Sequence, residues 1–273
     1  MRRLLPSLAV NGLLVLAAAL ALAPLLWMVS VSFMRPGEAD SFPPPLLPTA
    51  PSLAAYQELF ARHGMGRYFV NSLFLAGSTT ALSLVFNVMA GYAFAKLRFT
   101  GRDRTFQVLL GALVIPGQVA MIPLFLMLKP LGLVNNFGGV LVPAAAGVFG
   151  IFLVRQYALS IPDELLEAAR VDGASEFRLF RSIVLPALGP IMVTLATFTF
   201  LAAWNDFMWP LIVLNDDRLY TLPLALASLS REHVQDSELM MAGAVVTVAP
   251  VLLLFVVLQR YYIRGLLAGS VKG

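Results

Sequence analysis

The sequence contains no cysteine. This absence excludes disulfide bonds, thiolate metal sites and cysteine nucleophiles. The chain also lacks the Gly-x-x-x-x-Gly-Lys-Ser/Thr motif with which P-loop proteins bind ATP, and the His-Glu-x-x-His motif of zinc peptidases. Its two histidines, His63 and His233, are far apart in the sequence. We therefore predict that the chain is not an enzyme and that it binds no metal and no cofactor.

Charged residues are also scarce. They make up 12% of the 273 residues, whereas 59% are hydrophobic, and a soluble globular chain carries roughly a quarter charged residues. The mean hydropathy of +0.82 agrees with this imbalance. The net charge is +4, but the basic residues lie between apolar runs, a pattern typical of membrane proteins rather than of nucleic-acid-binding proteins. We therefore predict a chain surrounded by membrane lipid, with no nucleic acid as partner.

Six apolar stretches are long enough to form a spanning helix, which needs about 20 residues. The predicted spans are Leu8–Phe33, Asn71–Ala95, Phe106–Leu128, Phe137–Val154, a segment from Pro186 to about Val213, and Met240–Leu258. The first run exceeds the apolar core of a signal peptide, about 7–15 residues, so we expect it to remain as a span. The predicted fold class is all-α, a polytopic membrane protein with about six transmembrane helices.

The positions of Lys and Arg predict the orientation. If the N-terminus is cytoplasmic, thirteen of these residues lie in inside segments and six in outside segments, as the positive-inside rule requires. Both termini and residues 155–186 should then face the cytoplasm, and residues 35–70 and 215–238 should face outward. The proline-rich first part of the 35–70 segment favours an extended path, and we expect a short helix over Ala54–Ala61.

The segment Ser160–Pro186, between the fourth and fifth predicted spans, is more than a simple connector. Ser160 and Asp163 fit a capping box, and Pro162 suits the first helical turn. The positions of one expected helix face, spaced at i, i+3, i+4 and i+7, are Leu165, Ala168, Ala169 and Asp172. Gly173 should end this helix, because glycine adopts the left-handed conformation at no steric cost.

A second short helix should begin at Ser175, with Phe177, Phe180 and Val184 on one side. The whole segment is thus predicted to be a helix–turn–helix at the cytoplasmic membrane surface. From these features alone two interpretations remain open. The segment is either an amphipathic linker that covers lipid headgroups or a docking element for a cytoplasmic partner.

The order of residues in this segment is more specific. Glu167-Ala168-Ala169 is followed by Gly173 after a gap of three residues and by Ile183 after a further gap of nine. One residue then separates Ile183 from Leu185-Pro186. This spacing resembles the cytoplasmic signature of binding-protein-dependent ABC importer permeases. The resemblance implies that the segment couples to an ATPase. The residues that it implicates are Glu167, Ala168, Ala169, Asp172, Gly173, Ile183, Leu185 and Pro186.

The resemblance extends along the chain and narrows the family. Leu25–Phe33, Gly91–Arg102, Trp204–Pro210 and Gly265–Gly273 are similar to segments of the shorter, six-span permease subunit of carbohydrate importers of the maltose type, a type I ABC importer class. This likeness implies a single transmembrane permease domain over residues 1–273, with a core of about 67–263.

The same resemblance implies the partners and the location. They are a second permease subunit, two cytoplasmic ABC ATPase subunits that hold ATP and Mg, and an extracytoplasmic solute-binding protein, in the cytoplasmic membrane of a prokaryote. The implied solute is a sugar. The alternatives are a polyol or glycerol-phosphate-type solute in the same importer class, and a stand-alone secondary transporter.

Asn205 and Asp206 are the candidates for substrate contact. They lie near the predicted outer end of the fifth span, and an ionisable residue at membrane depth is a functional candidate. The alternative for Asp206 is a position near the outer headgroups, between Trp204 and Trp209 as belt aromatics. The alternative for Asn205 is a hydrogen bond to a neighbouring helix.

Overall fold

The computed structural model describes residues 4–232 and 236–270, and within them it is helical with no β-strand. Arg2, Arg3, His233 and Lys272 lie outside the described residues. The helices are α1 (Leu4–Ser32), α2 (Ala54–Ala61), α3 (Met65–Lys96), α4 (Arg102–Ala112), α5 (Gly117–Leu128), α6 (Gly138–Ala144), α7 (Val148–Ala158), α8 (Asp163–Val171), α9 (Glu176–Leu179), a π-helical turn (Phe180–Val184), α10 (Leu185–Ala187), α11 (Gly189–Trp204), α12 (Met208–Val213), a 3₁₀ turn (Asp217–Leu219), α13 (Leu222–Glu232) and α14 (Ser237–Ser270). The predicted all-α class and the short helix Ala54–Ala61 are confirmed.

Four helical segments are long and apolar enough to cross a membrane: Val10–Ser32, Met65–Lys96, Gly138–Ala158 and Ser237–Val257. Two bent pairs raise the number to six if each pair counts as one span. The first pair is α4 with α5, bent by 105°, and the second is Glu176–Ala187 with α11, bent by 74°. The chain is therefore a polytopic helical membrane protein with four to six candidate spans.

Three predicted spans are not continuous helices, and one of them, Phe137–Val154, is divided between α6 and α7. The predicted span Phe106–Leu128 breaks between α4 and α5, directly before and at Pro116, because proline has no N–H to donate and disfavours helical conformation in the residue before it. The predicted fifth span breaks after Trp204, and α12 begins a new short helix at Met208. An apolar run reveals the length of a span but not such breaks.

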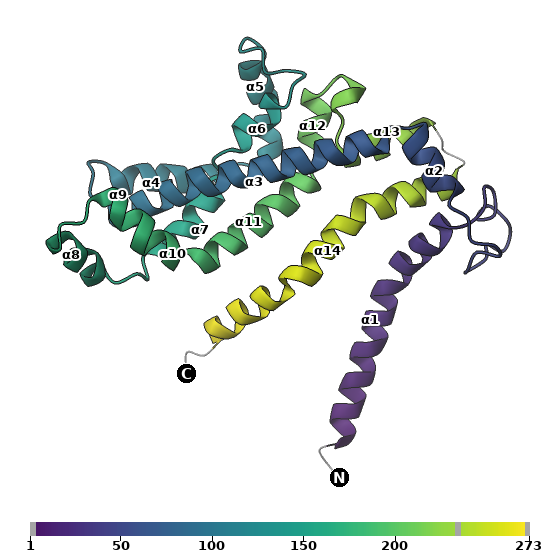
Figure 1. Ribbon diagram of the computed structural model, residues 1–273, viewed down its shortest axis with the longest axis horizontal. Helices are drawn as coiled ribbons and strands as arrows, with labels where there is room; N and C mark the ends of the chain where they lie inside the picture. The colour runs from purple at the N-terminus through teal and green to yellow at the C-terminus, as the bar shows by residue number, and fades with distance from the viewer. Residues whose placement is uncertain (1–3, 233–235, 271–273) are drawn as a thin grey trace. The chain divides into compact units, whose positions relative to one another are not determined.

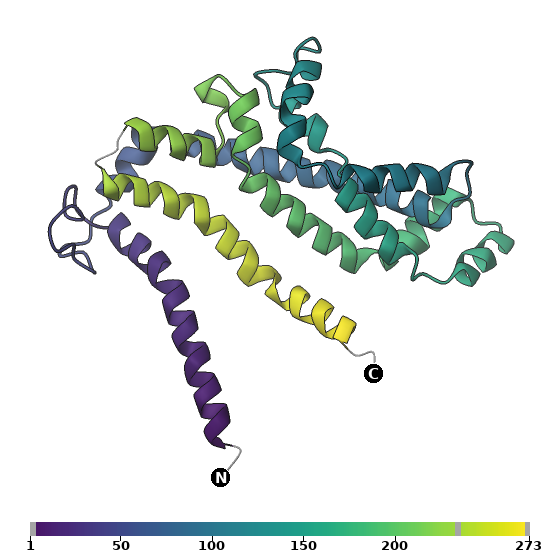
Figure 2. The ribbon, with the colours of Figure 1, turned by 180° about the vertical axis from the view of Figure 1, so that it is seen from behind.

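The chain forms two compact units. Unit 1 runs up to Phe69 and includes Leu222–Leu253, and unit 2 comprises Val70–Thr221 and the chain from Leu254. In unit 2, α3 runs alongside α7 and α11 (Figure 1, Figure 2).

In unit 1, the loop after α1 is compact. The Ser52 backbone N–H donates to Phe33 O at 2.8 Å, and the Thr49 backbone N–H and hydroxyl both donate to the carboxylate of Glu38. The predicted extended path is therefore wrong, because these bonds to Glu38 and Phe33 fold the prolines into a closed loop. The buried carboxylate of Glu238 accepts a hydrogen bond from the Ala39 backbone N–H at 2.9 Å, which ties the loop to the start of α14.

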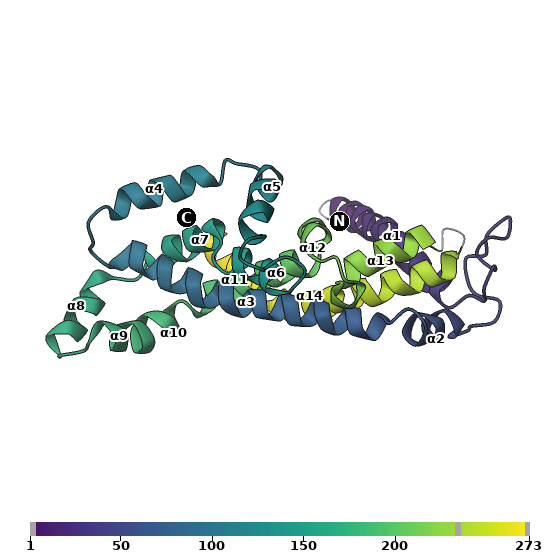
Figure 3. The same ribbon diagram turned by 90° about the horizontal axis from the view of Figure 1, so that it is seen from above.

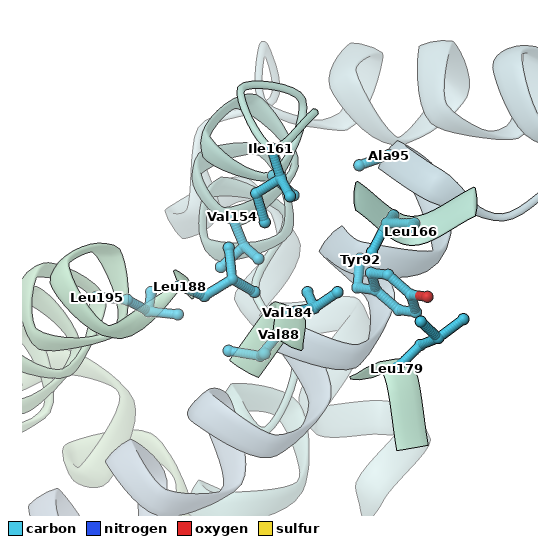
Figure 4. Packing of buried hydrophobic residues seen from close by; sticks show 11 residues of the cluster. Val88, Tyr92, Ala95, Val154, Ile161, Leu166, Leu179, Val184, Leu188 and Leu195 are labelled. Carbon is cyan, nitrogen blue, oxygen red and sulfur yellow. The ribbon is translucent and has the colours of Figure 1, made fainter. Parts of the chain in front are cut away.

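The core of unit 2 forms where α3, α7 and the helices from α8 to α11 meet (Figure 4). Its buried members are Val88, Tyr92, Ala95, Val154, Ala158, Ile161, Leu166, Leu179, Val184, Leu188 and Leu195. Glycine permits this approach at Gly91 in α3, where an added β-carbon would lie 2.6 Å from the Val154 side chain in α7. Small residues at helix contacts are typical of packing inside membranes.

Gly91→Ala should destabilise the protein, because the new methyl group meets Val154 and the Arg155 backbone. Overpacking of this kind typically costs about 1–3 kcal/mol. The measurement is the apparent melting temperature of the purified protein in detergent. Gly77→Ala, on the same helix, is the matched control, because within the described residues no atom other than those of its chain neighbours and its own helix backbone lies within 4 Å of its added β-carbon. Equal melting temperatures for the two variants would contradict the packing assigned to Gly91.

Candidate functional site

The first candidate element is α8, which lies at the end of unit 2 (Figure 1, Figure 3). It begins at Asp163, directly after Pro162, and carries Asp163 and Glu164 in its first turn, where the helix dipole favours negative charge. The predicted capping box is wrong, because the Ser160 hydroxyl donates to Tyr157 O at 2.7 Å. The helix cannot begin earlier, since Pro162 disfavours helical conformation in the residue before it.

The two long sides of α8 differ in burial. Leu166 is 1% exposed, and Ala169 packs against the core of unit 2. Leu165, Ala168 and Asp172 are exposed, spaced at i, i+3 and i+7. The face predicted from sequence is therefore divided, with Ala169 turned toward the protein and the other three positions facing away from its core. We call Leu165, Ala168 and Asp172 the outer face of α8.

Gly173 forms the turn after α8. Its φ of +80° is in the left-handed region, as predicted, and a β-carbon in this conformation costs roughly 1–2 kcal/mol. The Ala174 backbone N–H donates back to Ala169 O at 3.0 Å and closes the turn. Ser175 then caps the next helix, because its hydroxyl accepts a hydrogen bond from the Arg178 backbone N–H. The predicted glycine turn and second helix are confirmed.

The second helix buries a different set of residues from the predicted one. Val184 is fully buried, and Phe180 packs against Tyr92 with ring centroids 5.2 Å apart, but Phe177 is 72% exposed. Leu179, which is 0% exposed and belongs to the core of unit 2, takes the buried position that was predicted for Phe177. Ile183 and Leu185 pack against the core of unit 2, whereas Pro186 is exposed.

Polar side chains hold the turn between the two helices. The guanidinium of Arg170 in α8 donates to both carboxylate oxygens of Glu176 in α9, at 2.7 and 3.3 Å. The Tyr92 hydroxyl in α3 donates to the same carboxylate at 3.4 Å. Bidentate Arg–carboxylate pairs fix geometry as well as adding energy. The turn is therefore braced across Gly173 and linked to α3.

Lys96, the last residue of α3, makes the other link to α8. Its side chain is 4% exposed, and its ammonium donates to Ile161 O and to the Asp163 carboxylate, both at 2.6 Å. The hydrogen bond from Lys96 lowers the pKa of Asp163. A lowered carboxyl pKa means that the pair contributes stability above the ordinary pKa and loses it only as pH falls through the lowered value. The link is therefore complete at neutral pH.

Sequence reasoning did not single out Lys96, Tyr92, Arg170 or Glu176. A signal for Lys96 was present, since it is the one charged residue in the second half of an otherwise apolar helix. The link itself could not be predicted, because Ile161 lies 65 residues away along the chain.

The structure separates Asn205 from Asp206. The Asn205 side chain donates to Leu201 O at 2.8 Å and is exposed at the end of α11. Asp206 is half-buried, and its carboxylate accepts from the Trp209 backbone N–H at 3.3 Å, at the start of α12. Asp206 lines a cavity of about 600 Å³ in unit 2, and Asn205 does not.

The helices and the helix–turn–helix together define a class of protein. It is a polytopic helical membrane protein with broken spans and a braced helix–turn–helix whose outer face carries no partner within the described residues. Comparison with known proteins identifies the family. Residues 87–267 match the model of the family described as binding-protein-dependent transport system inner membrane component.

Relatives agree along nearly the whole chain. The arabinooligosaccharides transport system permease protein AraQ of Halalkalibacterium halodurans is 38% identical over 94% of this chain and 93% of its own length. The lactose transport system permease protein LacG of Rhizobium radiobacter is 34% identical over 100% and 98%. A chain of a bacterial ABC transporter involved in the import of the acidic polysaccharide alginate matches with a TM-score of 0.84 and 25% identity, covering 94% of this chain and 96% of that one.

The chain therefore belongs to the binding-protein-dependent transport system inner membrane component family. It is a permease subunit of an importer and not an enzyme. The family resemblance found in the sequence is confirmed.

Lys96→Met should loosen α8 without disturbing the spans, because methionine keeps the apolar stem but donates no hydrogen bond to Ile161 O. A buried acceptor that loses its donor costs about 1–3 kcal/mol. Amide hydrogen exchange of residues 163–171 should then rise by about 5- to 150-fold. Arg104→Met, at an exposed position of α4, is the control and should leave that exchange unchanged. Unaltered protection of α8 in Lys96→Met would show that the link is dispensable.

Proposed function

We propose that this chain pairs with a second permease subunit to form the alternating-access pathway of an ABC importer for a sugar. The outer face of α8 is the surface on which a cytoplasmic ATPase subunit docks. ATP and Mg belong to that ATPase, two copies of which serve the importer, and an extracytoplasmic binding protein delivers the solute. The observation that carries this proposal is the braced helix–turn–helix at the end of unit 2.

The exposed residues of this segment support docking rather than a lipid-covering linker. Leu165 is 49% exposed, Val171 88% and Phe177 72%, within a stretch that also exposes the carboxylates of Glu167 and Asp172. Apolar side chains exposed beside charges on both sides of the turn are typical of a protein-binding surface. The small Ala168 between them allows a partner to approach the helix closely.

The bracing supports transmission of force. A partner can shift the equilibrium between two conformations of the permease only if its contacts differ between them. A rigid element transmits such a difference over a longer distance than a mobile one. Arg170, Glu176 and Lys96 tie α8 to α9 and to α3. Movement of α8 is thereby passed to a membrane-spanning helix. This interpretation assigns the signature residues Glu167, Ala168, Asp172 and Gly173 to coupling.

The sugar assignment is supported by the relatives' names. Besides arabinooligosaccharides and lactose, they include alpha-glucoside and melibiose/raffinose/stachyose permease proteins. One relative, of Synechocystis, is named an osmoprotective compounds uptake permease protein, so the second candidate remains a non-sugar solute, of the polyol or glycerol-phosphate type. The stand-alone secondary transporter is excluded by membership of the family.

Neighbouring alanines on α8 provide a matched test of docking. Ala168→Trp should leave the melting temperature near that of the wild type but reduce copurification of the ATPase and transport, because the bulky ring stands on the outer face. Ala169→Trp should instead lower the melting temperature, since Ala169 packs on the core; overpacking costs about 1–3 kcal/mol. If Ala168→Trp copurifies with the ATPase and transports normally, the docking proposal is wrong and the helix–turn–helix is only a linker.

The proposed orientation has both termini and α8 in the cytoplasm and the loop after α1 outside. The natural absence of cysteine makes single-cysteine labelling unambiguous. Ser41→Cys, in the exposed loop, should react with an impermeant thiol reagent in intact cells, whereas Glu164→Cys, exposed on α8, should react only after permeabilisation. The reverse pattern would overturn the orientation.

A further inference from the structure

The connection between α3 and α4 lies at the end of unit 2 that carries α8 (Figure 3). Residues 98–104, in this connection and the first turn of α4, line a hollow of about 600 Å³. We call these residues the arginine pocket. They include three arginines and one aspartate, which gives a net charge of +2. The volume is within the range of about 300–1,000 Å³ that small-molecule sites occupy.

The three arginines of the pocket differ in what they already bind. Arg102 is committed to the protein, because its guanidinium donates to the Leu97 carbonyl oxygen at 3.3 Å and to the Asp103 carboxylate at 3.0 Å. Arg98 and Arg104 are exposed, and within the described residues their guanidinium groups take part in no hydrogen bond or ion pair. Arginine binds phosphate groups with two parallel hydrogen bonds. Two such groups beside one hollow are therefore available to a phosphate.

The carboxylates around the pocket do not cancel its charge. Asp103 neutralises one of the three arginines. Asp163 is bonded to Lys96 at 2.6 Å, and this hydrogen bond, more than the charge of Arg98, lowers the pKa of Asp163. Like charges that lie close together repel one another, so an anion bound between the remaining arginines would stabilise the pocket.

Aromatic packing holds the arginine pocket in shape. The Phe99 ring packs against Phe94 in α3 with centroids 5.7 Å apart, and Phe106 in α4 packs against the same ring at 5.5 Å. The guanidinium of Arg155 in α7 lies 4.1 Å from the Phe106 ring centroid and donates to the Phe94 carbonyl oxygen at 3.2 Å. Both ends of the connection are thus fixed to other helices. A pocket that is ordered before its ligand arrives binds that ligand at a lower entropic cost.

The surroundings of the pocket favour a lipid over a soluble anion. α4 and α5 together form one of the candidate spans, so the pocket lies where the chain enters the membrane. Phe99 is 45% exposed beside the two available arginines, and Val108, further along α4, is 75% exposed. Basic groups next to exposed apolar side chains suit the boundary between lipid headgroups and acyl chains. A soluble phosphate would leave the apolar side chains without a contact.

We propose that the arginine pocket is a docking surface for an anionic phospholipid. The phosphate oxygens of the lipid accept hydrogen bonds from Arg98 and Arg104, and its acyl chains lie against Phe99. This inference goes beyond the proposed function, because it depends neither on the solute nor on the ATPase partner. Lys96, which holds α8, directly precedes the pocket. The lipid and the helix–turn–helix therefore contact the same end of α3.

The test titrates the purified full chain, in an uncharged detergent, with dioleoylphosphatidylglycerol. Native mass spectrometry measures the dissociation constant of the first bound lipid. Arg98→Gln and Arg104→Gln should each weaken binding roughly 5-fold and the double variant about 30-fold, because each basic residue near the membrane surface adds a similar attraction. Dioleoylphosphatidylcholine, which has the phosphate but no net charge, should bind the wild type more weakly and should be insensitive to these changes.

The matched control is the double variant Arg178→Gln/Arg181→Gln. Both arginines are exposed at the same end of unit 2 but do not line the pocket. The control therefore loses the same charge and should bind phosphatidylglycerol as the wild type does. The melting temperature of Arg98→Gln/Arg104→Gln should stay near that of the wild type, since neither guanidinium bonds to the described part of the chain.

Each alternative gives a different result. If Arg98→Gln/Arg104→Gln binds phosphatidylglycerol as tightly as the wild type, the lipid docks elsewhere and the proposal is wrong, which is the result expected if these arginines meet an acidic partner protein instead. An equal loss in the control would mean a diffuse attraction to positive charge and no docking surface. If inorganic phosphate displaces phosphatidylglycerol, or if the wild type binds phosphatidylcholine equally well, the ligand is not an anionic phospholipid. All of these results leave the proposed function standing.

Discussion

The close contact between α3 and α7 at Gly91 and Val154 is the packing interaction on which both candidate sites depend. It allows α3 to contribute Val88 and Tyr92 to the core of unit 2. The same helix places Thr79 and Ser83 on the cavity wall and ends at Lys96, which holds α8. A displacement of α3 relative to α7 would therefore disturb the cavity and the helix–turn–helix together.

This shared helix offers a simple physical route between the two sites. Ser83 and Lys96 are 13 positions apart, which is about 20 Å along a helix. A helix of this length packed on two others moves largely as a rigid body. Lys96 and Tyr92, near the end of α3, both bond to the helix–turn–helix. Movement of α8 therefore acts on that end of α3, and the same helix carries the hydroxyls of Thr79 and Ser83. Coupling in this scheme requires no flexible connector within unit 2.

Breaks in the spans add polar groups at the cavity. Where α11 ends at Trp204 and α12 begins at Met208, backbone groups leave the regular helical pattern. Asp206 satisfies one of them by accepting from the Trp209 N–H. Irregular backbone at membrane depth is tolerated where protein or a cavity surrounds it. The break that hydropathy could not reveal is thus the feature that brings a carboxylate to the cavity.

The sequence alone determined the local features of this protein: the apolar runs, the glycine turn at Gly173, the Ser175 cap and the spacing that relates the chain to its family. Each of these depends on residues within a few positions of one another, so composition and order are sufficient. Only the tertiary structure decided that Ala169 faces inward, that Phe177 is exposed, and that Lys96 reaches Ile161. It also decided that Asp206, and not Asn205, lines the cavity. These outcomes depend on which helices pack together, because contacts between residues far apart in the chain have no local pattern to predict them.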